Sequence, residues 1–283
     1  MIPNKHSVYA LDFAFYSSSG VYDFGAQCEM MKAIGYDGLH FSAWDGRRWQ
    51  TTRQLADAKD KYGIDISGIY IVLDLSQGAD HPVNSGILTM LEHLEGCTTV
   101  NLAIRSAGAG LKPGDERGYA PVQAWLQHAL AVCERRGIDL LLYPHIGFWM
   151  EGHAIAVRLN QETNHPLLGI VYTGFYWYAL EGGNPLPVLR EVLPYLRQVH
   201  LSGSRRSPLG FGQVATIEPL DVGECDNFAI IGGLKSLGYA GPIGYLGWDE
   251  GGNPYNKLKR SHDALREMIA LADAHPHWTN HLG

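Results

Sequence analysis

Short apolar runs alternate with longer amphipathic runs along the whole chain. The short runs are rich in β-branched and aromatic residues, and they predict eight strands, at Val8–Phe15, Gly38–Phe41, Ile64–Leu73, Thr99–Ile104, Asp139–Tyr143, Leu168–Tyr172, Gln198–Leu201 and Ile243–Gly247. The longer runs predict helices near Phe24–Ile34, Thr52–Tyr62, Val83–Leu94, Pro121–Arg136, Gly152–Gln161, Pro187–Leu196, Asn227–Leu237 and Asn256–Ala274. This strand-by-helix alternation predicts an α/β protein.

Glycine recurs where a predicted helix ends and the next strand is about to begin, at Gly35, Gly63, Gly137 and Gly238. Glycine after the last helical turn readily adopts the left-handed conformation that turns the chain. Eight strand–helix units, with no linker or low-complexity segment between them, predict a single (β/α)₈ TIM barrel as one domain over residues 1–283. A doubly wound open sheet is the main alternative, but no G-x-G-x-x-G turn follows the first predicted strand.

The stretch Leu140–Gly147 shows where the chemistry of such a barrel would lie. A continuous apolar run suits a strand that is covered on both faces, and this one ends in Tyr143 and His145. Active sites of TIM barrels form at the carboxyl ends of the strands. Two long loops, Ser106–Ala120 and Ser202–Asp226, leave the same face, and loops of this length in a compact domain are usually functional.

Composition narrows the class of protein. The chain is 46% hydrophobic and 18% charged, with a net charge of -7 and no basic stripe, so we expect neither nucleic-acid nor membrane binding. The N-terminus has no apolar segment typical of a signal peptide, which predicts a cytoplasmic location. The four cysteines, Cys28, Cys97, Cys133 and Cys225, are far apart and indicate neither a disulfide framework nor a zinc knuckle.

Three histidines stand at or near predicted strand ends: His40, His145 and His200. Because histidine titrates near neutral pH, they are candidate catalytic acids and bases, together with Tyr143. The alternative is that they are structural and bonded to the backbone. They could also converge on a soft metal such as zinc, although we expect no cofactor.

Polar and aromatic residues near the same strand ends are candidate substrate ligands. The set is Trp44, Asp74, Arg105, Tyr172, Trp177, Arg205, Trp248, Asp249 and Glu250. Arginine clamps a carboxylate or phosphate through paired hydrogen bonds, and aromatic rings pack on the C–H faces of sugars. Surface ion pairs and core packing are the alternatives, but the pattern favours a carbohydrate-like pocket.

Four stretches resemble one known family. They are Gly35–Phe41, Tyr143–His145, Val199–Ser202, and Pro219–Asp226 followed by Leu237–Ile243. Their order and spacing over essentially the whole chain are similar to the xylose-isomerase-like barrels, the sugar phosphate isomerase/epimerase superfamily that also contains endonuclease IV. The resemblance implies a TIM barrel that forms homo-oligomers in many members.

The resemblance also implies a divalent metal, held by Glu, Asp, His and Glu at the ends of strands five to eight. Three of these positions differ here, where Tyr143, Tyr172 and Leu246 replace the carboxylates and only His200 is kept. One histidine cannot hold a hard cation, so we expect the usual metal site to be absent. At the second strand His40 stands where the family usually has glutamate.

These observations lead to two main expectations. The first is an enzyme related to sugar isomerases, epimerases or lyases, in which His145 or His200 abstracts a proton next to a carbonyl. Tyr143, Arg105 or the other histidine would then stabilise the oxyanion. The second is a non-catalytic sugar-binding or regulatory module. An endonuclease is disfavoured, because neither its metal ligands nor a basic groove is evident.

Overall fold

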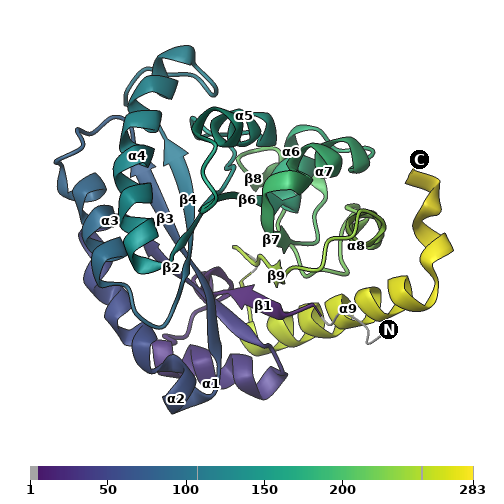
Figure 1. Cartoon of the computed structure of the whole chain (residues 1–283). Helices are drawn as coiled ribbons and strands as arrows, with labels where there is room; N and C mark the ends of the chain where they lie inside the picture. The colour runs from purple at the N-terminus through teal and green to yellow at the C-terminus, as the bar shows by residue number, and fades with distance from the viewer. Residues whose placement is uncertain (1–5, 107, 250, 283) are drawn as a thin grey trace. The chain divides into compact units, whose positions relative to one another are not determined.

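The computed structural model describes residues 6–106, 108–249 and 251–282. Figure 1 shows the strands, which are β1 (Val8–Leu11), β2 (Gly38–Trp44), β3 (Asp65–Asp74), β4 (Thr99–Arg105), β5 (Asp139–Leu142), β6 (Leu168–Thr173), β7 (Leu196–Leu201), β8 (Arg206–Phe211) and β9 (Ile243–Tyr245). All except β8 form a closed barrel in the order β1-β2-β3-β4-β5-β6-β7-β9. The predicted TIM-barrel fold is therefore confirmed.

The α-helices are α1 (Phe24–Ile34), α2 (Ala58–Tyr62), α3 (Pro82–His93), α4 (Tyr119–Arg136), α5 (His153–Thr163), α6 (Gly174–Leu180), α7 (Leu186–Val192), α8 (Asn227–Ser236) and α9 (Pro254–Ala274). The 3₁₀ segments are Asp12–Phe15, Gly46–Asp57, Glu116–Gly118, Leu193–Tyr195 and Pro276–Leu282. The four junction glycines all have positive φ, 109° at Gly35, 67° at Gly63, 65° at Gly137 and 79° at Gly238. Their predicted role in ending the helices is confirmed.

Two sequence-based boundaries are wrong in a way that affects the site. The first strand was expected to reach Phe15, but it ends at Leu11 and the chain turns into a 3₁₀ segment. This turn brings the Phe13 ring to 5.4 Å from the Trp248 ring, measured between centroids. The loop after β7 was expected to lack regular structure, but it contains β8, whose first residue Arg206 pairs antiparallel with Ala215.

The chain divides into two compact units, each described by itself. The central unit is His40–Val171, and its strands β3, β4, β5 and β6 pair in parallel. Helix α3 packs against β3 and α4 (Figure 1). It begins at His81, whose side chain accepts a hydrogen bond from Val83 N, and Pro82 occupies its first turn. A proline in this position is favourable because its missing N–H would have no helical partner.

The terminal unit comprises the residues up to Leu39 and from Tyr172 onward. Here β9 pairs in parallel with both β1 and β7. Gly244 in β9 lies so close to Tyr9 that a Cβ at this position would stand 2.3 Å from the ring, so only glycine fits. The long helix α9 packs on α1, α8 and β1. It begins at Asn253, which accepts hydrogen bonds from two backbone N–H groups.

No helix in the described part of the chain has the length and apolar character needed to cross a membrane.

Candidate active site

Inward-pointing side chains of alternate strands meet in the central unit, as expected for the layers inside a TIM barrel. His40 on β2 donates a hydrogen bond from Nε2 to Asn101 Oδ1 on β4 (2.8 Å). Tyr70 on β3 and Tyr143 after β5 pack edge to face, with ring centroids 5.1 Å apart. All four side chains are fully buried. Two of the four predicted catalytic residues, His40 and Tyr143, thus lie inside the packed barrel.

Burial sets the protonation state of these groups. Desolvation lowers the pKa of His40 to about 4, although the hydrogen bond with Asn101 opposes the shift. Burial likewise raises the pKa of Tyr70 well above 10, and the nearby Tyr143 adds to the rise. His40 is therefore neutral near pH 7, and Tyr70 keeps its proton.

His145 is placed differently, in a tight turn directly after β5. Its backbone N–H donates to the carbonyl of Met150 (2.9 Å), and Met150 N–H donates to Ile104 on β4 (3.1 Å). The imidazole stacks on Phe148, with ring centroids 3.9 Å apart. His145 Nδ1 donates to the carbonyl of Ile146 (2.8 Å). Because a carbonyl only accepts, the proton sits on Nδ1 and the lone pair on Nε2.

His145 is half-buried, whereas His40 is fully buried. Desolvation still lowers the pKa of His145 to about 4, more than the backbone hydrogen bond raises it. The imidazole is therefore neutral at physiological pH, and the lone pair lies on Nε2.

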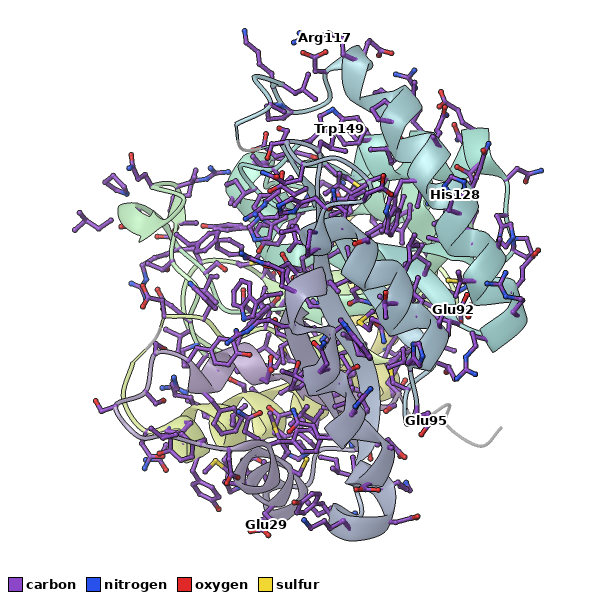
Figure 2. All side chains as sticks on the ribbon, turned by 90° about the vertical axis from the view of Figure 1, so that its left-hand side faces the viewer. Glu29, Glu92, Glu95, Arg117, His128 and Trp149 are labelled. Carbon is purple, nitrogen blue, oxygen red and sulfur yellow. The ribbon has the colours of Figure 1, made fainter. Side chains whose placement is uncertain are left out.

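The loop after β4 is fixed to the His145 turn by Trp149. The indole donates to the carbonyl of Asp115 (3.0 Å), and Gly114 N–H donates to the carbonyl of Trp149 (2.9 Å). Gly118 packs so close that a Cβ there would meet the indole at 2.2 Å. Figure 2 shows Trp149 among the packed side chains of this unit and Arg117 at its outer end. The predicted functional loop thus supports the turn that carries His145.

Asp74 and Arg105 form an ion pair at the carboxyl ends of β3 and β4, where they are partners in the strand register. Asp74 Oδ2 accepts from Arg105 Nε (2.9 Å) and Nη2 (2.8 Å). Asp74 Oδ1 accepts from the backbone N–H (2.9 Å) and hydroxyl (2.6 Å) of Ser76. Burial alone would raise the pKa of Asp74, but these hydrogen bonds and the arginine charge outweigh it, and the pKa is lowered.

Trp44 ends β2 in a strained backbone conformation. Its φ is 67°, in the left-handed region that a bulky residue rarely adopts. The half-buried indole packs edge to face on Tyr70, with centroids 6.1 Å apart. Strain of this kind persists where the surroundings enforce it, often at ligand sites. Asp249, which follows β9 in the terminal unit, has a similar φ of 57° and is exposed.

In the terminal unit His200 lies on β7, fully buried, with its ring edge-on to Tyr9 of β1 at a centroid distance of 5.6 Å. Tyr172 and Trp177, both predicted to bind substrate, are buried and tilted against each other at 6.4 Å. Burial raises the pKa of Tyr172 well above 10. Helix α6, which carries Trp177, was not predicted.

Aromatic rings cluster around Trp248 in this unit. The half-buried indole packs edge to face with Phe13 (5.4 Å), Tyr16 (6.2 Å) and Phe211 of β8 (6.4 Å). Tyr16 donates its hydroxyl hydrogen to Asp12 (2.8 Å), a carboxylate with almost no exposed surface. Trp248 is among the residues predicted to bind substrate, but its partner Phe211 is not, because it lies in β8, which was not predicted.

The two arginines after β7 have structural partners. Arg205 is exposed and pairs with Glu218 through Nε (2.7 Å) and Nη2 (3.1 Å). Arg206 donates to the carbonyls of Ala179 (3.2 Å) and Tyr178 (3.0 Å) at the end of α6. The predicted role of Arg205 in substrate binding stays a prediction. Glu250, also predicted to bind substrate, lies outside the described residues.

The residues at the family's metal-ligand positions do not suit a divalent metal ion. The corresponding positions are the neutral phenols Tyr143 and Tyr172, the apolar Leu246 and one imidazole, His200. Over the described ranges, no three or more His, Cys, Asp or Glu side chains form a group that could hold a metal ion. The three candidate histidines therefore form no such group, and we assign no step to a metal.

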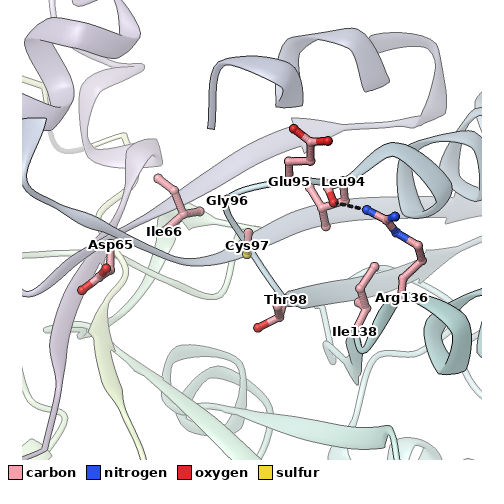
Figure 3. A pocket seen from close by; sticks show the side chains of 9 residues that line it. All are labelled: Asp65, Ile66, Leu94, Glu95, Gly96, Cys97, Thr98, Arg136 and Ile138. Atoms are coloured by element: carbon pink, nitrogen blue, oxygen red, sulfur yellow. Dashed lines mark hydrogen bonds between the residues drawn. The ribbon is translucent and has the colours of Figure 1, made fainter. Parts of the chain in front are cut away.

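A cavity of ≈ 440 Å³ lies at the other end of the strands in the central unit (Figure 3). It is lined by residues at the amino ends of β3, β4 and β5, including Asp65, Cys97 and Ile138. Arg136 donates to the carbonyl of Leu94 beside it (3.0 Å). Burial raises the pKa of the Cys97 thiol to about 11, so it is a poor nucleophile. This end of a barrel serves stability, not catalysis.

The chain is similar to several solved structures over nearly its whole length. L-ribulose 3-epimerase shares 15% identity at a TM-score of 0.76, with 98% of each chain covered. The 3-keto-D-glucoside 4-epimerase from E. coli shares 16% identity at a TM-score of 0.69, covering 93% of this chain and 100% of that one. A xylose isomerase domain protein from Planctomyces limnophilus shares 18% identity at 0.68, covering 95% and 98%. At these identities the likeness shows the fold alone.

No curated protein matches the sequence. A family model described as "Xylose isomerase-like TIM barrel" matches residues 28–268, which is most of the chain. Together with the closed parallel barrel, this match shows that the chain belongs to the xylose isomerase-like TIM-barrel family.

Proposed function

We propose that this protein is an isomerase or epimerase that acts on a carbohydrate or keto-sugar by removing a proton next to a carbonyl, without the family's usual divalent metal. Family membership and the sugar epimerases among the similar structures support the substrate class. The observation that carries the proposal is His145, a half-buried residue whose neutral imidazole is held at the carboxyl end of β5.

His145 has the geometry of a general base. The Ile146 carbonyl fixes the proton on Nδ1, so Nε2 accepts the substrate proton while the electron pair of the C–H bond moves toward the carbonyl oxygen. Return of the proton to the neighbouring carbon, with transfer of the adjacent hydroxyl proton to the former carbonyl oxygen, gives an isomer. Delivery of a proton from solvent to the opposite face of the original carbon gives an epimer, and His145 then releases the proton that it took. A base with a pKa near 4 is weak, which favours a keto-sugar, whose C–H is already acidified by the carbonyl.

A non-catalytic sugar-binding protein is the second candidate. It is favoured by the complete burial of His40, His200 and Tyr143, three of the four residues predicted to be catalytic. Of the four, His145 is half-buried and the other three are fully buried.

A keto-sugar turnover screen on matched variants separates the two candidates. His145→Asn keeps a donor for the Ile146 carbonyl but removes Nε2, and we expect turnover to fall by about 10²- to 10⁴-fold. His165→Asn is the control, because His165 is also in the central unit but pairs with Glu134 on the surface. Sugar binding without turnover in the unmodified protein would instead establish the binding module.

A further inference from the structure

The Asp74–Arg105 pair leaves one edge of a guanidinium available. Asp74 occupies the side of Arg105 formed by Nε and Nη2. The other edge, formed by Nη1 and the second hydrogen of Nη2, has no partner among the described residues. The Arg105 side chain is 37% exposed, whereas that of Asp74 is 5% exposed. Asp74 therefore holds the buried edge of the Arg105 guanidinium, and the other edge faces away from Asp74.

Asp74 is itself held rigidly, so the orientation of Arg105 is determined in advance. Ser76 donates two hydrogen bonds to Asp74 Oδ1. Asn84 at the start of α3 binds the backbone of Asp74 in both directions, as acceptor from its N–H (2.9 Å) and donor to its carbonyl (2.9 Å). A preorganised fork loses less entropy on binding than a flexible side chain.

The strand ends around the Arg105 guanidinium include an aromatic ring, the Trp44 indole, on which a sugar can pack. The charge of Arg105 acts on Tyr70, which contacts the strained, half-buried Trp44. It also acts on Asp45, the residue after Trp44. Asp45 is already bonded by Arg47 through Nη2 (2.7 Å), so its charge is offset locally. The indole thus stands at the carboxyl end of β2 and the guanidinium at that of β4, the two strands on either side of β3.

We propose that the outer edge of Arg105 binds an oxyanionic group of the substrate, a carboxylate or a phosphate, while Trp44 packs against the sugar ring. The natural substrate is then an acidic sugar. The two parallel N–H groups of this edge match the two oxygens of such a group, whereas the single oxygen of an enolate would use only one of them. This inference rests on the proposed function but deepens it, since it names the substrate class.

The test compares D-glucuronate with D-glucose as ligands, measured by isothermal titration calorimetry. The two sugars differ at one carbon, so the ratio of their dissociation constants isolates the acidic group. We expect the unmodified protein to bind glucuronate about tenfold or more tightly than glucose, as for one charge-assisted bidentate contact. Raising the salt concentration should reduce this preference. The same comparison with glucose 6-phosphate distinguishes a phosphate from a carboxylate.

Three variants check the assignment. Arg105→Met combined with Asp74→Asn removes the contact without leaving a buried unpaired carboxylate, and we expect the preference to disappear. Arg105→Lys keeps the charge but loses the fork, so the preference should be reduced. Arg117→Met is the control, because Asp115 holds Arg117 through the same two nitrogens. Thermal unfolding confirms that each variant is folded.

Several results would overturn the inference. These are equal binding of acidic and neutral sugars by the unmodified protein, binding of neither, or a preference that survives in the double variant. The outcome is separable from the proposed reaction. A preference for acidic sugars without any keto-sugar turnover would reject the proposed reaction and retain the acidic-sugar subsite. Turnover of neutral keto-sugars without that preference would retain the reaction and reject the subsite.

Discussion

The strand ends of the central unit and those of the terminal unit carry different chemistry. In the central unit they carry the bonded pair Asp74 and Arg105, and deeper in the strands His40 is bonded to Asn101. In the terminal unit they carry rings that pack edge to face around Trp248. Hydrogen-bonded pairs fix the orientation and the charge of their side chains, whereas packed rings provide an apolar contact surface of defined shape.

Under the proposed function, the two sets of side chains have different parts in recognition. For the central unit we propose that Arg105 recognises charge and that His145, whose Nδ1 proton is fixed by the Ile146 carbonyl, acts as the base. The rings of the terminal unit suit the apolar faces of a sugar. Each unit should therefore respond to a different kind of perturbation.

Truncation of a buried ring should have the largest effect on stability. Phe13 is buried between Tyr16 and Trp248, and we expect Phe13→Ala to lower the free energy of unfolding by about 3–5 kcal/mol. Phe211→Ala is the matched control, because Phe211 touches the same indole but is half-buried. Urea denaturation measures both. Equal losses would mean that the cluster is not the packed core of this region.

Acid should weaken the central unit through its buried histidines. Desolvation lowers the pKa of His40 to about 4 and that of His153 to about 3, from an ordinary value of 6.5. At pH values between the lowered pKa of each histidine and its ordinary pKa of 6.5, the unfolded chain binds more protons than the folded one. Stability therefore falls as the pH drops below about 6.5. At pH 4.5 each histidine should cost roughly 2 kcal/mol.

Urea denaturation at pH 7 and pH 4.5 measures this loss. His153→Leu cannot take up a proton, so the difference between the two pH values should be smaller in this variant than in the unmodified protein. An unchanged difference would contradict the assigned pKa of His153.

Removal of an exposed ion pair should have the smallest effect. Arg205 and Glu218 are bonded, but the arginine is exposed, and exposed pairs contribute little. We expect Arg205→Met to leave the urea midpoint unchanged within error. A clear drop would show that this pair organises β8 and the rings beside it.

Local patterns were enough to predict the barrel. Apolar runs of strand length, helices that end at Gly35 or Gly137, and the order of elements are all set by nearby residues. The strand end at Tyr143 and His145 was located for the same reason. Asp74 and Arg105 were each identified as candidate ligands, since each directly follows a predicted strand, but their pairing was not predicted.

Features that depend on distant partners were missed. Nothing in the sequence around Asn101 indicates that it accepts from His40, 61 residues away. A polar residue inside an apolar strand was a usable signal, because buried polar groups are almost always bonded. Helix α6 and β8 were missed because their short segments lack a clear period. The depth of His200 depends on packing against Tyr9, which a strand-end rule does not capture.

The central claim is that His145 removes a proton from the carbon next to a substrate carbonyl. It is tested most directly by incubating a keto-sugar substrate with the protein in D₂O and following the C–H signal by proton NMR. We predict that the unmodified protein exchanges this hydrogen for deuterium and that His145→Asn does so no faster than buffer. Equal exchange by the two proteins would contradict the account.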